Sequence, residues 1–318
     1  MKLFGELMSA HTSMRVGGPA EVFAEPADEG ELIELVHESH IRDSRYFLLG
    51  NGTNVIVRDK GYPGTVISTL KALGGAPGPQ RFEPAILHQP DIFAPPISAP
   101  LPSPGAGAVD ARVISCGAGE PLSRICRTAA ERGLSGMEGL SGIPGTLGGA
   151  VFMNAGAYGY EISSFVESIR AYSVLDNNII MLSKKDCEFG YRSSVFKYKP
   201  LVILSAELVL EHSDREKIET DMAEYAKKRN EKQPVAQPSA GSFFKRPQGD
   251  FAARLIEAAG MKGAEIGGAK ISDIHAGFII NKGDATAADI LALANEVKKK
   301  VKERFDIELE EEPLIIGV

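Results

Sequence analysis

The stretch from Gly139 to Tyr160 constrains the fold of this chain more than any other, because it holds seven glycines. A glycine cluster this dense is tolerated where the backbone must bend sharply or approach another group closely. A flexible surface loop and a backbone cradle for a phosphate-bearing ligand are the two interpretations. The apolar residues Ile143, Leu147 and Val151 lie among the glycines, and flexible linkers lack such residues. The pattern therefore favours the cradle, whose N–H groups would supply hydrogen-bond donors.

A second candidate cradle is the Gly/Asn-rich segment from Gly50 to Asn54. It lies between two short apolar runs, 46–49 and 55–57, which predict strands. A tight hairpin turn joining those two strands is the alternative interpretation, because glycine and asparagine suit such turns as well. This segment taken alone does not distinguish the two.

Composition narrows the class of protein. The chain has 318 residues, is 43% hydrophobic and carries a net charge of −7, as expected for a globular protein of two or three domains. The acidic balance argues against nucleic acid or an anionic membrane as partner. Three scattered cysteines and the lack of an HExxH motif predict neither a disulfide scaffold nor a metal site. Since no apolar run approaches the length of a signal or membrane segment, we expect a cytoplasmic protein.

Regular elements are predicted on both sides of one unusual segment. Residues 74–110 carry nine prolines, which forbid a regular helix or a central strand, so we expect a partly disordered insertion there. A hairpin is expected over 166–182, with a turn at Asp176, Asn177 and Asn178. Periodicity and capping signals predict the other elements. Helices are expected from Asp28, from Pro121, from 213 or 214 to about 230, over 250–259 and over 286–304, and a last strand over 307–316.

Several common nucleotide-binding signatures do not occur in the sequence. It contains no GxGxxG motif, no Gly-Lys dipeptide and no GxSxG motif, so a Rossmann site, a P-loop and a hydrolase nucleophile elbow are unlikely. Two glycine-rich turns without a Rossmann motif suggest a flavin nucleotide held by a different fold.

Five motifs, taken together, resemble the UDP-N-acetylenolpyruvoylglucosamine reductases. They are HTSMRVGG at 11–18, LGNGTN at 49–54, GIPGTLGGA at 142–150 continuing into MNAGAYG at 153–159, YRSS at 191–194 and GSFFK at 241–245. They follow the family order over nearly the whole chain apart from the insertion. The resemblance implies FAD as cofactor and NADPH as co-substrate. It also implies an α+β fold of the vanillyl-alcohol-oxidase-like (PCMH) type, with two FAD-binding domains and a C-terminal substrate domain.

The resemblance also predicts domain limits and a physiological setting. The FAD-binding parts would span 1–68 and 69–208, the latter with the insertion; the substrate domain would span 209–305, and residues 306–318 would return to the active site as a strand. The expected partners are small molecules, a UDP-sugar enolpyruvyl ether and NADPH, bound by a monomer that serves peptidoglycan synthesis. There are two rival interpretations: another FAD-linked oxidoreductase of the same fold, and a non-catalytic protein that binds a sugar nucleotide.

The implied reaction assigns three catalytic residues by resemblance: Arg192, Ser242 and Glu312. Hydride from flavin N5 would reach the enol ether, and the neighbouring carbon would take a proton from Ser242. A carbanion beside a carboxylate delocalises into an enolate, which fixed cations such as Arg192 stabilise. Because this carbanion is strongly basic, a serine hydroxyl suffices as its acid. Glu311 is an alternative to Glu312, since a slip of one residue reverses the faces of a strand.

The resemblance assigns binding residues as well. Lys232 and Arg246 match substrate-binding positions. The chain leaves no room between Arg192 and the strand at 201 for the tyrosine-bearing loop of the larger family type, so it resembles the shorter second type, and what clamps the nucleotide stays open. The predicted cofactor-binding residues are Gly50, Asn51, Gly52, Thr53, Asn54, Gly142, Ile143, Pro144, Gly145, Thr146, Gly148, Gly149, Asn154, Gly156 and Ala157.

Overall fold

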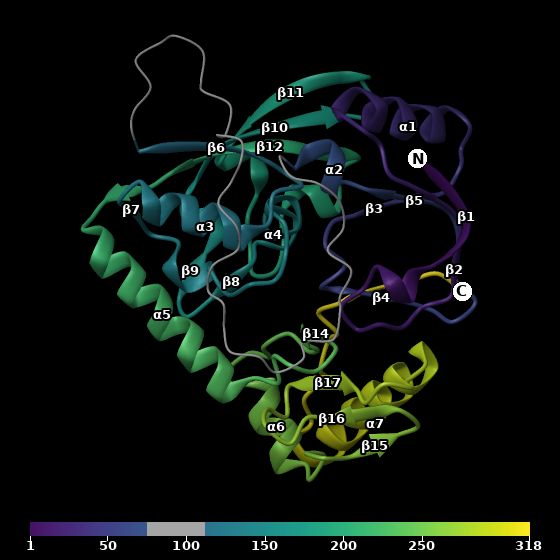
Figure 1. Cartoon of the computed structure of the whole chain (residues 1–318). Helices are drawn as coiled ribbons and strands as arrows, with labels where there is room; N and C mark the ends of the chain where they lie inside the picture. Colours follow the sequence, from purple (N-terminus) through teal and green to yellow (C-terminus); the bar gives the residue numbers. More distant parts are fainter. Residues whose placement is uncertain (75–111) are drawn as a thin grey trace.

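A computed structural model describes residues 1–74 and 112–318 (Figure 1). Three four-stranded β-sheets, three two-stranded sheets and their helices make up this part of the chain. The predicted Pro-rich insertion at 74–110 lies, apart from Gly74, outside the described residues. One long helix, α5, runs from the upper part of the molecule to the lower part (Figure 1). Within the described residues, no helix is long and apolar enough to cross a membrane.

The first sheet is built from the N-terminal residues and is flanked by helix α1. Its strand order is β1-β2-β5-β3, with an antiparallel β1–β2 pair and parallel pairs elsewhere. The carboxylate of Asp28 begins α1 by accepting a hydrogen bond of 2.9 Å from the Glu31 N–H, as its capping signal predicts. The elements are β1 Lys2–Leu7, β2 Pro19–Ala24, α1 Glu29–Ile41, β3 Tyr46–Leu49, β4 Val55–Val57, β5 Tyr62–Ser68 and α2 Leu70–Leu73.

The second sheet has the order β11-β10-β12-β6 and is antiparallel throughout. Helix α1 packs between the first two sheets, because its buried Leu32 and Val36 belong to the same core as Ile169 of β10. The elements are β6 Val113–Gly117, α3 Leu122–Glu131, β7 Leu134–Ser135, α4 Leu147–Met153, β8 Gly156–Ala157, β9 Tyr160–Glu161, β10 Val166–Ser173, β11 Asn178–Ser183, β12 Leu201–Val209 and β13 Glu211–His212.

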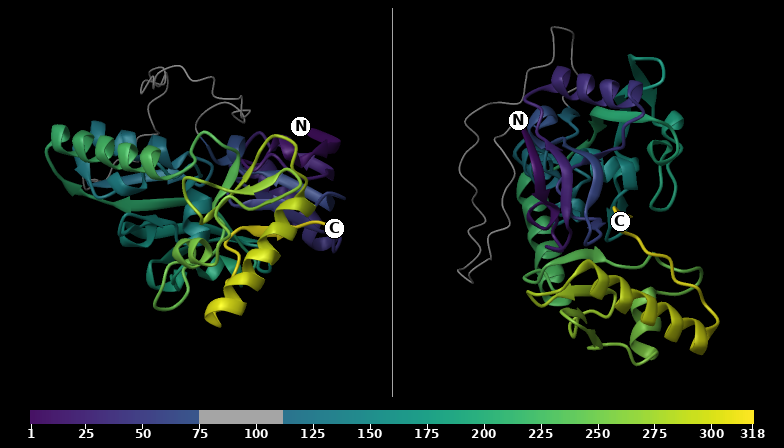
Figure 2. Two further views of the ribbon diagram at one scale, coloured as in Figure 1. Left: turned by 90° about the horizontal axis from the view of Figure 1, so that it is seen from below. Right: turned by 90° about the vertical axis from the view of Figure 1, so that its right-hand side faces the viewer.

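A third, smaller antiparallel sheet with the order β14-β17-β16-β15 forms the lower part of the molecule together with helices α6 and α7. Thr286 and Asp289 form a capping box at the start of α7. Figure 2 shows the C-terminal segment leaving α7 and running back towards the upper part. The elements are α5 Arg215–Lys232, β14 Ser239–Ser242, α6 Ala252–Ala258, β15 Glu265–Ile266, β16 Ala269–Ile271, β17 Phe278–Asn281, α7 Ala287–Phe305 and β18 Leu314–Ile316.

Hydrogen bonds between distant residues fix the third sheet against the N-terminal part. The Asp59 carboxylate accepts from the N–H groups of Ala287 and Ala288 at 2.8 Å each, at the start of α7. The Ser13 hydroxyl donates to the Ser239 carbonyl at 2.6 Å, beside β14. The core of the third part also contains Met14 and Ile56. These contacts position β14, which carries Ser242, over the first sheet.

One alternative interpretation and one expectation about strands are wrong. The segments β3 and β4 are not a hairpin: β3 pairs with β5, whereas β4 pairs in parallel with β18. The segment 50–54 is therefore a crossing between two sheets. The last strand is also shorter than 307–316, since it covers only Leu314–Ile316. The run of acidic residues before Pro313 forms only an isolated antiparallel bridge, between Glu311 and Phe244, and proline at 313 lacks the N–H that a continuous strand would use.

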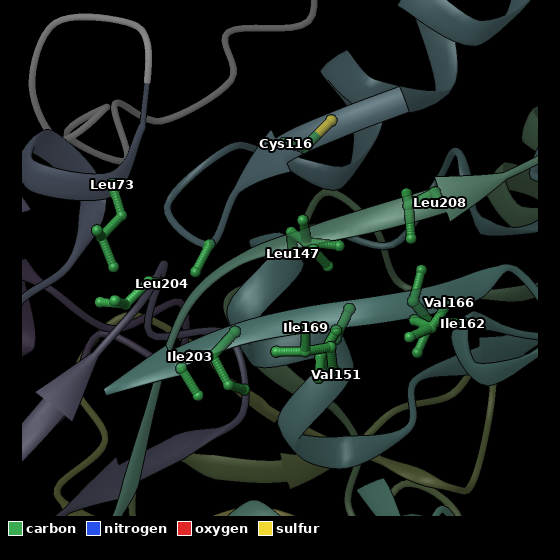
Figure 3. Packing of buried hydrophobic residues seen from close by; sticks show 14 of the residues in the cluster. Leu73, Cys116, Leu147, Val151, Ile162, Val166, Ile169, Ile203, Leu204 and Leu208 are labelled. Atoms are coloured by element: carbon green, nitrogen blue, oxygen red, sulfur yellow. The ribbon is translucent and has the colours of Figure 1, made fainter. Parts of the chain in front are cut away.

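Helix α4, inside the glycine stretch, was not predicted from the sequence. Its glycines have low helix propensity, yet Thr146 caps it by accepting from the Gly149 N–H at 3.3 Å. Leu147 and Val151 of α4 face Ile169 of β10 in the core (Figure 3). Packing of this apolar stripe therefore outweighs the poor propensity of the glycines.

Gly52→Ala should destabilise the protein by about 1–3 kcal/mol or more. Gly52 has a φ of +62°, where a side chain is strained, and an added Cβ would overlap the His11 carbonyl. Urea unfolding measures the effect. Gly159→Ala is the matched control, because Gly159 has a φ of +88° but open space around its Cβ position. Equal losses in the two variants would contradict a close backbone approach at Gly52.

Candidate functional site

A cavity of about 1050 Å³ lies where the three sheets meet. Its lining includes Gly50 after β3, Gly145 before α4, Ser242 of β14 and Glu312 before β18. This volume matches the upper end of cofactor and ligand pockets. The cavity therefore has room for a large ligand in contact with all three parts of the molecule.

The two predicted cradles are in contact with each other, and both line this cavity. Asn51 Nδ2 donates to the Pro144 carbonyl at 3.3 Å, and a Cβ on Gly50 would lie 2.7 Å from Thr146 Oγ1. Glycine at 50 is thus required for the close approach of the two loops. In residues 1–74 and 112–318, the backbone N–H groups of Gly52 and Thr53 donate to no protein acceptor, which leaves them for a ligand.

The charge of the cavity lining is opposite to that of the chain. Glu312 is its one carboxylate among the described residues, although the chain has a net charge of −7. A cavity with this balance attracts anionic ligands. Together with the two glycine loops, it fits a phosphate-bearing cofactor or substrate. The cationic lining residues are Arg15, Arg192, Lys199, Arg229 and Arg246.

An ion pair between Arg192 and Glu312 lies in the cavity wall. Arg192 Nε is 3.0 Å from Glu312 Oε1, and each side chain is 18% exposed. Two carbonyls of the glycine stretch accept from the same guanidinium, Asn154 O from Nη1 at 3.4 Å and Gly156 O from Nη2 at 3.0 Å. Three of the five guanidinium N–H groups are thereby fixed to the protein, and two remain.

Backbone strain presents Arg192 to the cavity. Gly190 and Ser193 exchange backbone hydrogen bonds of 3.0 and 3.1 Å in a tight turn, and Arg192 between them has a left-handed φ of +51°. Such a conformation costs a non-glycine residue about 1–3 kcal/mol and is concentrated at functional sites. The surrounding contacts therefore hold this arginine where it is.

Glu312 and Glu311 point in different directions. The Glu311 carboxylate accepts from Lys298 of α7 at 2.9 Å, and Glu311 is not part of the cavity lining. Asn54 of the first cradle donates to the Glu312 carbonyl at 3.3 Å. Burial raises the pKa of Glu312 above its usual value, although the charge of Arg192 opposes this shift. The structure thus brings Glu312, and not Glu311, beside Arg192.

Ser242 and Arg246 reach the cavity from the third part. Ser242 Oγ is 3.5 Å from the Phe244 carbonyl, a contact at the limit of a hydrogen bond, so the hydroxyl is available to a ligand. The Arg246 N–H donates to Tyr191 Oη at 3.0 Å, which ties this segment to the turn of Arg192. The Arg246 guanidinium lies 4.3 Å from the Phe251 ring.

Two of the predicted binding residues do not line the cavity. Asn154 is 1% exposed, and its side chain bonds to Glu161, Gly190 and Ser163, so it supports the turn of Arg192 from behind. Lys232 is the last residue of α5, is exposed and lies outside the lining. The other predicted cofactor-binding residues, and Arg192, Ser242, Arg246 and Glu312, all line it.

Arg229 lines the cavity but was not predicted. The apolar stripe Ile218, Met222 and Tyr225 of α5 continues to residue 229 with helical spacing. That spacing was the available signal. Resemblance drew attention instead to Lys232, three residues further on.

The raised pKa of Glu312 predicts a pH-dependent difference in stability between the wild type and Glu312→Gln. A carboxyl with a raised folded-state pKa contributes stability that is fully present below the unfolded value, here 4.5, and is lost as pH rises through the folded pKa. Relative to the variant, the wild type should therefore lose up to about 1.4 kcal/mol per pH unit above pH 4.5. Urea unfolding at several pH values measures this, and parallel curves would contradict it.

Comparison with known proteins agrees with this geometry. Residues 106–178 match a family model described as an FAD binding domain, and residues 233–316 match one described as the C-terminal domain of UDP-N-acetylenolpyruvoylglucosamine reductase. An α+β fold with two glycine loops around a cation-lined cavity, together with the first match, defines an FAD-dependent oxidoreductase. The predicted fold class and cofactor are thereby confirmed.

Relatives over the full length identify the family. The chain is 42% identical to a UDP-N-acetylenolpyruvoylglucosamine reductase of Caldanaerobacter subterraneus subsp. tengcongensis, over 98% of this chain and 92% of the relative. It is 41% identical to that of Clostridium novyi, over 98% and 91%. The crystal structure of the Thermus caldophilus reductase covers 100% of this chain and 98% of its own, with 30% identity and a TM-score of 0.75. The chain belongs to the UDP-N-acetylenolpyruvoylglucosamine reductase family.

Proposed function

We propose that this protein reduces UDP-N-acetylglucosamine enolpyruvate to UDP-N-acetylmuramate, with bound FAD and with NADPH as reductant, in peptidoglycan precursor synthesis. The observation that carries this proposal is the meeting of Ser242, Arg192 and Glu312 from separate parts of the chain in one cation-lined cavity. It is supported by the family to which the chain belongs.

The two glycine loops would hold the cofactor. Gly50 and Gly148 let these loops pack closely on their neighbours, because a Cβ there would lie 2.7 Å from Thr146 Oγ1 or 3.0 Å from the Ala118 Cβ. The free N–H groups of Gly52 and Thr53 would bind phosphate oxygens. When bound, FAD supplies the hydride chemistry that the amino acids lack.

Arg192 would stabilise the negative charge that develops beside the substrate carboxylate. Its two uncommitted N–H groups match the two oxygens of a carboxylate or enolate, and its other three hold it in place before the substrate arrives. Such preorganisation is what electrostatic catalysis requires.

Ser242 Oγ would donate the proton to the carbon that carries this charge, and Glu312 would hold Arg192 in orientation. Burial lowers the pKa of Lys197. Its Nζ donates to the Arg192 carbonyl at 2.7 Å and supports the same turn.

Arg246 would contact the substrate from the third part. Lys232 is left out of this proposal because it is exposed outside the lining.

The proposal includes the setting and the domain division. A cytoplasmic monomer acting on small molecules is consistent with the described residues, and the limits 1–68, 69–208, 209–305 and 306–318 are supported by the three sheets. The β13–β7 pair and the parallel β18–β4 pair link these segments to each other.

Purified protein tests the proposal. It should show a flavin absorption spectrum and should oxidise NADPH only when the enolpyruvyl sugar nucleotide is present. Flavin reduction by NADPH followed by reoxidation with a different substrate would favour another oxidoreductase of this fold. A flavin that is neither reduced nor reoxidised would favour a non-catalytic sugar-nucleotide binder.

A further inference from the structure

Arg229 contacts the second glycine loop from helix α5. The Arg229 side chain lines the cavity, and it packs so closely on Gly142 that a Cβ there would lie 2.7 Å from the Arg229 Nε. Gly142 belongs to the same loop as Pro144, whose carbonyl accepts from Asn51 of the first loop. The guanidinium is therefore placed beside the surface where the two cradles meet.

Arg229 has no carboxylate partner within residues 1–74 and 112–318. Its neighbours are aromatic: the guanidinium lies 6.0 Å from the Tyr158 ring centre, and the tilted rings of Tyr158 and Tyr225 have their centres 4.9 Å apart. Two other cations of α5 are paired with acids, Arg215 with Glu219 at 2.6 Å and Lys228 with Glu224 at 3.3 Å. A half-buried guanidinium without a counter-ion is unfavourable unless an anionic ligand completes its contacts.

The turn between β8 and β9 sets the position of the Tyr158 ring. Tyr158 has a left-handed φ of +55° and Gly159 one of +88°, as a two-residue hairpin turn between the paired residues Ala157 and Tyr160 requires. The turn holds the Tyr158 ring, which is 38% exposed, between Arg229 and solvent. Burial lowers the pKa of Arg229, whereas its interaction with Tyr158 opposes this shift, and its ordinary value is so high that the group stays charged.

We propose that Arg229 binds a pyrophosphate group that lies along the loop 142–145, with Tyr158 and Tyr225 holding the guanidinium in place. This proposal rests on the proposed function, which offers two sources of that group, the FAD cofactor and the UDP-sugar substrate. Both present two adjacent phosphate groups, which the planar fork of an arginine can bind through paired N–H groups.

The test compares Arg229→Met with Lys227→Met, which removes an exposed cation of the same helix that is not part of the cavity lining. Apoprotein is titrated with FAD, and holoprotein with UDP and with the enolpyruvyl substrate. Loss of a charged hydrogen bond should weaken one of these affinities about 10- to 100-fold. Arg229→Lys, which keeps the charge without the fork, should recover part of the loss.

The titrations separate the two sources. A raised Kd for FAD with unchanged UDP binding assigns Arg229 to the cofactor, and the reverse assigns it to the substrate nucleotide. Both affinities unchanged in Arg229→Met, in protein that unfolds at the wild-type temperature, would overturn the proposal. Because the FAD and UDP titrations need no turnover, they report on Arg229 even if the wild type fails to reduce the enolpyruvyl substrate.

Discussion

Ser242→Ala should lower turnover of the enolpyruvyl substrate by about 100- to 10,000-fold, the usual contribution of a positioned general acid. Reduction of the flavin by NADPH should be nearly unchanged, because that step moves no proton from this hydroxyl. Among residues 1–74 and 112–318, the Ser242 hydroxyl makes one long hydrogen bond, of 3.5 Å, to the Phe244 carbonyl, so its removal should leave the fold intact. Stopped-flow absorbance of the flavin measures the two half-reactions separately.

Ser239→Ala is the matched control for Ser242→Ala. Ser239 lies at the other end of β14 and also lines the cavity, and its contact with Ser13 uses the backbone carbonyl, which the variant keeps. It should retain both half-reactions. Ser242→Cys, which keeps a dissociable proton, should retain more activity than the alanine variant. Equal losses in both half-reactions of Ser242→Ala would mean that the serine is not the proton donor.

Local signals predicted the parts of the fold that depend on neighbouring residues. The hairpin β10–β11 follows from its turn residues, and α7 from the helical period of its apolar residues Ile290, Leu293 and Val297. Pairing between distant residues left no such signal. The parallel pair of β4 and β18 joins Val55 to Leu314, and nothing within either short apolar run specifies that partner. A hairpin between β3 and β4 was therefore a reasonable alternative, and it was wrong.

The candidate site was also predicted only in part from the sequence. Motif order located the two loops, Arg192, Ser242 and Glu312, all of which line one cavity. The motif could not show that the Asn154 side chain faces away from it, because glycine and asparagine positions of a loop look alike whether they bind a ligand or support a turn. It also could not show that Arg229, rather than Lys232, lines the cavity. Both residues lie on one side of α5, but Lys232 is the last residue of the helix and is exposed.

Arg192→Lys should lower turnover by about 100- to 1,000-fold, the effect of losing a preorganised donor to a developing negative charge. Arg192 holds three protein acceptors, Glu312, Asn154 and Gly156, and still has two N–H groups left for the substrate. Lysine has three N–H groups on one nitrogen, so it cannot keep these contacts and also bind a carboxylate with two parallel hydrogen bonds. Steady-state kinetics with the enolpyruvyl substrate measure the loss.

Arg170→Lys provides the matched control, because Arg170 forms a bidentate pair with Glu29 at 2.6 and 2.7 Å between β10 and α1, away from the cavity lining. That variant also loses a pair of parallel guanidinium hydrogen bonds, so it should lower the free energy of unfolding. It should leave kcat within about twofold, since it alters no ligand contact. If Arg192→Lys instead kept a wild-type kcat and lost only stability, the Arg192–Glu312 pair would be a structural ion pair like Arg170–Glu29. The charge stabilisation would then have to come from another cation of the lining, Arg246 or Lys199.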